Sequence, residues 1–229
     1  MNIFKCIGKT FVLSIALAAL PHQSAYSDPI NPVMPEEMQG VSVIPLDNHP
    51  VPDILKDQAR VEIAQMKSQG YVDSDESSVA YLEAAKSDKK RLKSMSEVAP
   101  SLKILPANID NSNLGQATLL GAIASGGYTD EGWTGVNRLF VVPKLGLVGL
   151  EEVDYVASGG GFAMIKEAIN QDVNGNPAIL RVKQSQSQKS LSELTWATDR
   201  KIYTLSVNRA LKTQQAIEEF LSLARAISD

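Results

Sequence analysis

The sequence predicts an α+β protein in which an antiparallel sheet is covered by a C-terminal helix. Strand-length runs rich in β-branched and aromatic residues follow one another from Trp133 to Val207, separated by Gly, Asn, Asp and Ser. Within Thr213–Ser228, apolar residues recur every three or four positions, which is the spacing of one buried helix face. Residues 53–96 come before the strands and predict an N-terminal helical hairpin.

The hairpin is expected to consist of two consecutive helices. The first begins at Asp53, directly after a proline, and stops at Gly70, because glycine readily adopts the left-handed conformation that ends helices. Asp73 and Glu76 have the spacing of a capping box at the start of the second helix. Acidic residues at that start and lysines towards residue 93 complement the helix dipole.

Six strands are expected in the region of residues 100–229. Leu114–Ser125, which precedes them, is compatible with a short helix or with a first buried strand. Asn174-Gly175 predicts a two-residue hairpin turn, since these residues accept the positive φ angles that such a turn needs. The six expected strands are Val136–Val142, Gly146–Val156, Phe162–Gln171, Ala178–Gln184, Leu191–Ala197 and Lys201–Val207.

The first 27 residues are expected to be a cleavable secretory signal. Lys5 and Lys9 precede the apolar run Phe11–Leu20, and Ala25-Tyr26-Ser27 supplies the small residues of a cleavage site. Ten apolar residues are too few to cross a bilayer, which needs about 20, so we expect no stable transmembrane anchor after cleavage. The expected location is the periplasm or the medium.

Residues 28–52 are expected to form an extended, proline-rich segment. Six of the 11 prolines lie between Pro29 and Pro52, and each fixes φ and removes a backbone donor. Val41–Ile44 is compatible with an added edge strand or with no fixed structure. The predicted organisation is therefore a signal peptide (1–27), this segment (28–52), the helical hairpin (53–96) and the sheet with its helix (100–229).

Composition excludes several function classes. The formal charge of −4 becomes −6 once Lys5 and Lys9 are removed, which argues against nucleic acid as a partner, because phosphate binding depends on Lys and Arg. The signal also contains the single cysteine, Cys6, and one of the two histidines. We therefore expect no disulfide, no cofactor and no metal, since His49 alone cannot complete a zinc shell.

Catalysis would have to depend on carboxylates. His49 lies in the proline-rich segment, without the rigid scaffold that a catalytic base needs, so no catalytic residue is assigned. Asp130-Glu131 and the cluster Glu151-Glu152-x-Asp154 are the available acid groups for glycosidase-type chemistry. On a strand, Glu152 and Asp154 would share one face, as they would in a merely exposed strand.

Aromatic and large apolar residues are the remaining candidates for a binding site. Tyr and Trp carry a polar atom that must be satisfied, so they often lie at the edge of a core or pocket. Gly159-Gly160-Gly161 would give such a pocket a movable rim. The same side chains are also compatible with an ordinary core. The candidate ligand-binding residues are Trp133, Phe140, Tyr155, Phe162, Met164, Trp196 and Tyr203.

The last 60 or so residues resemble a known class of domain. Asn174–Ala178, Leu194-Thr195-Trp196, Tyr203–Ser206 and a final helix with Ala224 look like the closing hairpins and helix of extracytoplasmic domains in bacterial envelope-sensing proteins. Those domains resemble the lipoprotein-carrier fold. The resemblance implies a curved antiparallel sheet with a helix in its hollow, and it transfers no functional residue.

Three functions follow as hypotheses. The leading one is an exported, non-enzymatic protein that binds an apolar small molecule or an envelope protein through the sheet. The second is a structural or assembly factor of the cell surface, contacted through the proline-rich segment and the helices. The third is a hydrolase that uses carboxylates alone.

Overall fold

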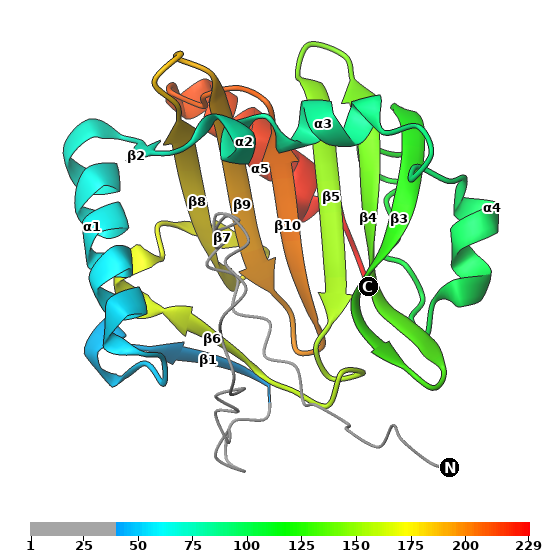
Figure 1. Ribbon diagram of the computed structural model, residues 1–229, viewed down its shortest axis with the longest axis horizontal. Coiled ribbons are helices and arrows are strands. Elements are labelled where there is room, and N and C mark those ends of the chain that lie inside the picture. Colours follow the sequence, from blue (N-terminus) through cyan, green and yellow to red (C-terminus); the bar gives the residue numbers. More distant parts are fainter. Residues whose placement is uncertain (1–39) are drawn as a thin grey trace, which may run out of the picture.

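A computed structural model describes residues 40–229 and shows one large mixed sheet with helices around it (Figure 1). The predicted signal peptide and residues 28–39 lie outside the described residues. The strands are β1 (Val41–Ile44), β2 (Val72–Asp73), β3 (Thr118–Thr129), β4 (Gly132–Val142), β5 (Gly146–Asp154), β6 (Phe162–Ile165), β7 (Gln171–Val173), β8 (Asn176–Gln184), β9 (Ser190–Ala197) and β10 (Lys201–Val207).

The main sheet has the strand order β2-β8-β9-β10-β5-β4-β3, and β7 also pairs with β8. Its strand pairs are antiparallel except for β2 and β8, which run parallel. β1 and β6 form a separate parallel pair. The helices are η1 (Leu46–Asn48), α1 (Asp53–Gln69), α2 (Glu76–Val79), α3 (Tyr81–Ser87), α4 (Met95–Val98), η2 (Ala99–Ser101), η3 (Lys166–Ala168) and α5 (Gln214–Arg225).

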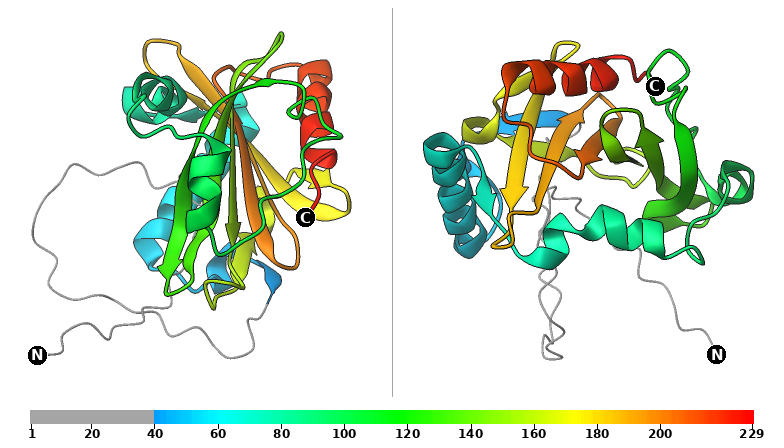
Figure 2. Two further views of the ribbon diagram at one scale, coloured as in Figure 1. Left: turned by 90° about the vertical axis from the view of Figure 1, so that its right-hand side faces the viewer. Right: turned by 90° about the horizontal axis from the view of Figure 1, so that it is seen from above.

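The helices lie on both sides of the main sheet. Figure 2 shows α5 along one face, and α2 and α3 near one end of the opposite face. α1 stands beside the β8 edge, next to the short β2 (Figure 1). Because strand side chains alternate between the two faces, each central strand contributes to both layers.

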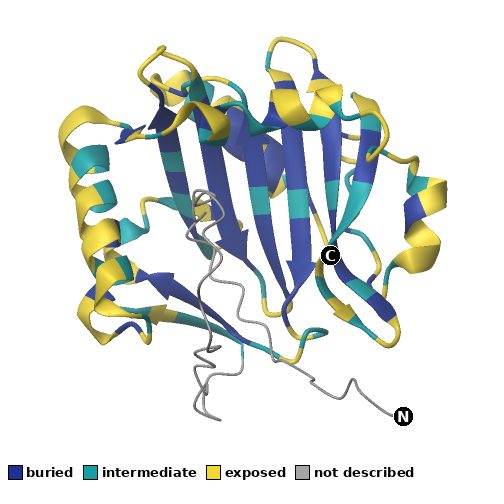
Figure 3. Cartoon of the chain, viewed as in Figure 1, coloured by how far each residue is buried: buried dark blue, intermediate teal, exposed yellow. Residues whose placement is uncertain are grey.

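The main core lies between the sheet and α5. Thr213 caps this helix, accepting a hydrogen bond from the Ala216 N–H at 3.2 Å, and Phe220 is fully buried. Trp196 and Tyr203 stack beneath it with ring centroids 5.0 Å apart. The central strands are accordingly buried along most of their length (Figure 3). Other buried members of this core are Phe140, Val148, Leu150, Ala178, Leu180, Leu194, Leu205 and Leu223.

A smaller core lies on the opposite face under α3. Leu82 is buried there against Leu139, Leu147 and Leu191. A Cβ placed on Gly149 would lie 2.8 Å from the Leu82 Cδ2 atom, closer than carbon atoms normally approach. The glycine therefore lets α3 sit directly on the sheet.

Most of the predicted strands are confirmed. β10 has the predicted bounds. The ends of four other strands, β4, β5, β8 and β9, differ from the predictions by a few residues. Leu114–Ser125, for which a helix and a strand were both compatible, lies mainly in strand β3. Asn174 and Gly175 both have positive φ and join β7 to β8, as the turn chemistry requires. The helix expected from Asp53 to Gly70 is α1, and Gly70 ends it at φ 78°.

Three predictions were wrong in detail. The sheet is mixed and not purely antiparallel, because β2 adds in parallel to β8. The second helix of the hairpin is replaced by the short helices α2, α3 and α4, since Val72-Asp73 pair with β8 and Lys93 bridges to Ala122 of β3. Phe162–Gln171 is not one strand: β6 ends at Ile165, where it has paired with β1, and η3 follows.

His49 is the buried polar residue of the segment that links η1 to α1. It is 1% exposed, and its Nε2 atom lies 3.5 Å from the Ala163 carbonyl oxygen. Burial lowers the pKa of His49, the contact with Ala163 partly opposes this, and the charge of Lys56 lowers the pKa further. The neutral imidazole is thus the form that the folded protein favours.

Removal of the Phe220 ring tests the main core. We expect Phe220→Ala to lower the free energy of unfolding by about 3–5 kcal/mol, because the ring is completely buried and its loss leaves a cavity. Denaturant unfolding followed by circular dichroism measures this. The control is Val61→Ala on the exposed side of α1, expected within about 0.5 kcal/mol of wild type. Equal losses in the two variants would contradict this description of the core.

The burial of His49 predicts a pH dependence of stability. The unfolded chain takes up a proton at the ordinary pKa of 6.5, whereas the folded chain resists protonation to lower pH, so stability falls as the pH drops below that value. We expect the loss between about pH 7 and about pH 5 to be smaller in His49→Gln. Urea unfolding of both proteins at the two pH values tests this, and identical pH slopes would contradict it.

Candidate functional site

A cleft between α1 and the β8 edge of the main sheet is the candidate functional site. Its volume is about 300 Å³, and its lining is mainly apolar. That volume is at the lower end of the roughly 300–1,000 Å³ typical of small-molecule pockets. The lining residues are Ala59, Glu62, Ile63, Met66, Lys67, Ile165, Glu167, Ala168, Ile169, Asn170, Ile179, Leu180 and Arg181.

One wall of the cleft is a stripe of α1. Ala59, Ile63 and Met66 recur at the three- and four-residue spacing that places side chains on one helix face. Ala59 is the one buried residue among the 17 of this helix. Ile63 and Met66 are only half-buried and border the open space, so most of the apolar stripe remains available to a ligand.

The opposite wall comes from β6, η3 and β8. Ile165 ends β6, and Ile169 and Ile179 face the cleft from beyond η3 and from β8. Ile169 and Ile179 also pack against the buried cluster that contains Phe162 and Met164. This wall is therefore backed by a core and is expected to be rigid.

Polar contacts keep α1 at the distance that leaves the cleft open. The Arg181 guanidinium donates to Glu62 of α1 at 2.8 Å, and its Nε atom lies 4.0 Å from Glu193. Lys183 completes this group with an ion pair of 2.8 Å to Glu193. In η1, which precedes α1, the Leu46 N–H donates to Glu167 of η3 at 2.9 Å.

The seven predicted ligand-binding residues lie in three different surroundings. Phe140, Trp196 and Tyr203 belong to the core beneath α5. Tyr155, Phe162 and Met164 form a second buried cluster with Ala197 and Ile202. Trp133 is half-buried near the start of β4, where its ring meets Tyr128 edge-on at 5.2 Å.

The seven residues therefore do not form one surface, and the cleft is lined by other residues. Phe162 and Met164 come nearest to it, because their cluster supports Ile169 and Ile179. Gly159–Gly161 lie before β6 as a turn, with Gly159 at φ 74°. Sequence reasoning missed Ile63 and Met66 as site residues; the signal was their place, with Ala59, on one face of α1.

Two further hollows are open and are lined mostly by polar and charged residues. One, of about 770 Å³, is lined by Asp73, Asp75 and Glu76 together with Ser and Gln side chains of the β8–β9 loop. The other, of about 600 Å³, lies between α3 and Lys189, Arg209 and Lys212. Their acids already have partners: the carboxylate of Asp75 accepts from Ser77 and Ser78, and that of Glu76 accepts from Ser187.

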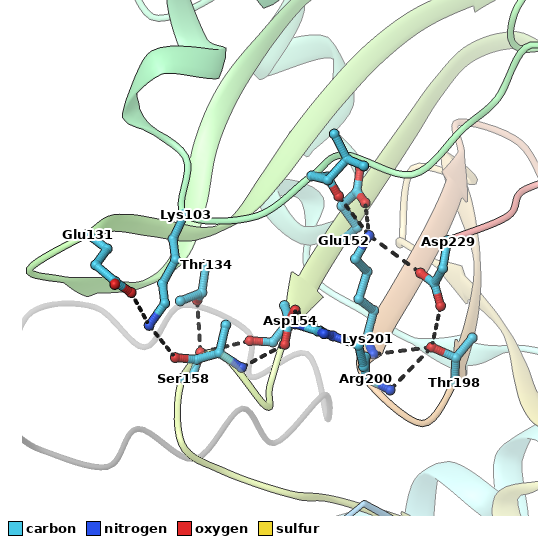
Figure 4. A network of polar contacts seen from close by, with 12 residues as sticks. Lys103, Glu131, Thr134, Glu152, Asp154, Ser158, Thr198, Arg200, Lys201 and Asp229 are labelled. Carbon is cyan, nitrogen blue, oxygen red and sulfur yellow. Dashed lines mark hydrogen bonds and ion pairs between the residues drawn. The ribbon is translucent and has the colours of Figure 1, made fainter.

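Charged residues are also buried on the α5 side of the sheet, where β5 ends and β10 begins, and Figure 4 shows their contacts. Glu152 is completely buried, and its two oxygens contact Arg138 at 2.7 Å and Lys201 at 3.4 Å. Lys201 reaches Asp229 at 3.4 Å, and Asp229 also accepts hydrogen bonds from Tyr203 and Thr198. Figure 4 shows Lys201 between the two carboxylates.

Two acids of the predicted cluster Glu151-Glu152-x-Asp154 have cationic partners in this region. The side chains of Glu152 and Asp154 share the α5 face of β5, and Asp154 accepts from Arg200 at 2.9 Å and from the Ala157 N–H at 2.6 Å. Both carboxylates are thus fully engaged in holding the structure together. Glu151 lies on the opposite face, where burial and then the charge of Glu193 raise its pKa. Asp130 and Glu131 occupy the exposed β3–β4 turn.

The described residues provide no metal centre and no spanning helix. The part of the chain from 40 to 229 contains no group of three or more His, Cys, Asp or Glu side chains placed to hold a metal ion. Over the same residues, no helix has both the length and the apolar character that crossing a bilayer requires.

The chain matches no protein-family model, no curated protein and no solved structure. The resemblance of its last 60 residues to envelope-sensing domains therefore stays a prediction, and the cleft has to be interpreted from its own geometry.

The ion network makes a prediction about stability. Glu152→Gln keeps the shape of the side chain but leaves Arg138 and Lys201 buried without their shared anion, so we expect a loss of about 3–5 kcal/mol in the free energy of unfolding. Glu131→Gln is the matched control, since that carboxylate also pairs with a lysine, at 2.9 Å, but is mostly exposed. A comparable loss in both variants by denaturant unfolding would contradict a special role for the buried network.

Proposed function

We propose that this protein is an exported, non-enzymatic binding protein of the bacterial cell envelope that holds an apolar ligand in the cleft between α1 and β8. Its export is inferred from residues 1–27, whose charge, apolar run and small-residue ending are typical of a secretory signal. The binding role is inferred from the cleft.

The observation that carries this proposal is the incomplete packing of α1. A helix that stands beside a sheet normally buries its apolar stripe against that sheet. Here Ile63 and Met66 face an open space of about 300 Å³, and the facing wall is also apolar. Leaving such surface in contact with water is unfavourable by about 25 cal/mol for each Å², so an apolar ligand gains free energy by covering it.

The rigid backing of the cleft supports the same proposal. Ile169 and Ile179 are held by a buried cluster, and the ion pair of Arg181 with Glu62 fixes the distance between the walls. A site that keeps its shape without a ligand loses less conformational entropy when it binds one.

A second candidate function is favoured by a different surface. Tyr128 is 71% exposed although it packs against Trp133, and Leu105 is 83% exposed. Tyrosine is enriched at protein interfaces, because its ring is apolar and its hydroxyl forms hydrogen bonds. These exposed side chains support the alternative of a structural or assembly factor, which would bind an envelope protein through the β3–β4 turn.

Filling the cleft tests the proposed function. We expect Met66→Trp to weaken binding of the neutral apolar dye N-phenyl-1-naphthylamine at least tenfold, because the indole occupies the space between the walls. Dye fluorescence titrated against the purified protein measures this. Val61→Trp adds the same ring on the exposed side of α1 and should leave the affinity unchanged. Equal affinities for Met66→Trp and wild type would overturn the proposal.

A further inference from the structure

The charges around the cleft are unevenly placed along it. Lys67 lines the end formed by the last turn of α1. Glu167 lines the end near the start of α1, where its carboxylate accepts from the Leu46 N–H. The cleft is therefore more positive at the Lys67 end than at the Glu167 end.

Each of the other charged or amide side chains that line the cleft has at least one protein partner. Glu62 and Arg181 are paired with each other. The Asn170 amide donates to the Leu180 carbonyl at 2.9 Å and accepts from the Leu180 N–H at 2.8 Å. Lys67, in contrast, forms no ion pair with any of residues 40–229. Lys67 is also exposed, so a ligand can use its ammonium group without displacing a protein contact.

From this arrangement we infer that the ligand is a single alkyl chain with one anionic head, bound with its head at Lys67 and its chain between α1 and β8. The inference rests on the proposed function. The chain contacts Ile63, Met66, Ile169 and Ile179 and points towards Ile165. Ala59 and Lys67 are eight residues apart, so the cleft follows α1 for about 12 Å, which suits a chain of medium length.

The chemistry of the walls explains why one polar end is enough. A ligand with polar groups along its length, such as a peptide or a sugar, would bury donors and acceptors against isoleucine and methionine, at a cost of roughly 1–3 kcal/mol for each unsatisfied group. A cationic head would meet Lys67. A neutral alkyl chain would fit the walls but would leave the ammonium group unused.

Binding of three probes with the same alkyl chain tests the inference. Decanoate, decanol and decylamine are titrated into the purified protein by isothermal calorimetry at about pH 7. We expect decanoate to bind about three- to fivefold more tightly than decanol, as an exposed ion pair allows, and decylamine to bind most weakly. The preference should decrease at high salt because ions screen the contact.

Substitution of Lys67 provides the decisive comparison. Lys67→Gln should abolish the preference for decanoate over decanol without weakening decanol, and Lys67→Glu should favour decylamine. Lys86→Gln is the matched control, because Lys86 is the basic residue in the last turn of α3 and does not line the cleft. Decyl phosphate in place of decanoate distinguishes a phosphate head from a carboxylate, and tighter binding of either anion than of decanol supports the inference.

Two failures are distinguishable. Equal affinities for decanoate and decanol, unchanged in Lys67→Gln, would overturn the inference about the head and leave the apolar cleft as the binding site. Absence of binding by all the alkyl probes, together with dye binding that Met66→Trp does not alter, would overturn the proposed function itself.

Discussion

The packing of α5 on one face of the main sheet is the contact on which the rest of the structure depends. Phe220 is fully buried in the core that α5 forms with β4, β5, β8, β9 and β10, and Trp196 and Tyr203 stack within this core. Side chains alternate between the two faces along a strand. The residues between those that face α5 therefore point to the opposite face of the sheet. That face carries Leu191 and Ile179 but also Glu193 and Thr204. α3 covers its upper end, and β6 packs on its lower end. Both faces of the sheet therefore combine apolar and charged residues, and the larger core lies on the α5 face.

The ion network on the α5 side shows how charged side chains are accommodated next to the main core. Glu152 is completely buried and would be costly without partners, but Arg138 and Lys201 supply them. Asp229 extends the network, and although burial raises the pKa of its carboxyl group, hydrogen bonds from Tyr203 and Thr198 and the charge of Lys201 bring that pKa below its ordinary value. These contacts fasten the segment after α5 to the ends of β5 and β10. Glu152 and Asp154, which the sequence offered as candidate catalytic acids, thus form ion pairs and hydrogen bonds that connect parts of the fold.

The cleft follows from the way α1 is attached. Ala59 packs against Leu46 and Ile165 near the start of the helix, Arg181 binds Glu62 in its middle, and β2 joins the sheet directly after its end. Between these attachments, Ile63 and Met66 stay half-buried and border the cleft. The walls stay apart because the ion pair sets their spacing, and the space between them remains apolar because isoleucines line both sides. Binding at this place is a consequence of the attachment points and not of any sequence motif.

Local features of the sequence were enough to predict much of the fold. The turn at Asn174-Gly175, the end of α1 at Gly70 and the amphipathic pattern of α5 each depend on residues that are close in the chain, and all three are present. Residues 73–96 were misjudged because their pairing partners, β8 and Ala122, lie far along the chain. Phe162–Gln171 was misjudged for a similar reason, since β6 pairs with β1 more than a hundred residues earlier.

The residues of the candidate site were not predicted, because they are brought together by contacts between segments that are distant in the sequence. Aromatic residues such as Phe140 and Tyr203 were predicted to bind a ligand, and the structure places them in the core, because burial depends on what packs above a strand. Ile63, Lys67 and Ile179 carry no motif and come together only when α1 is held beside β8. The sequence by itself determined α1, α5, the long strands β4, β5, β8, β9 and β10 and the turn at Asn174-Gly175, since these depend on residue type and near neighbours. Only the tertiary structure decided which apolar residues are enclosed and which border open space, because that depends on contacts between distant segments.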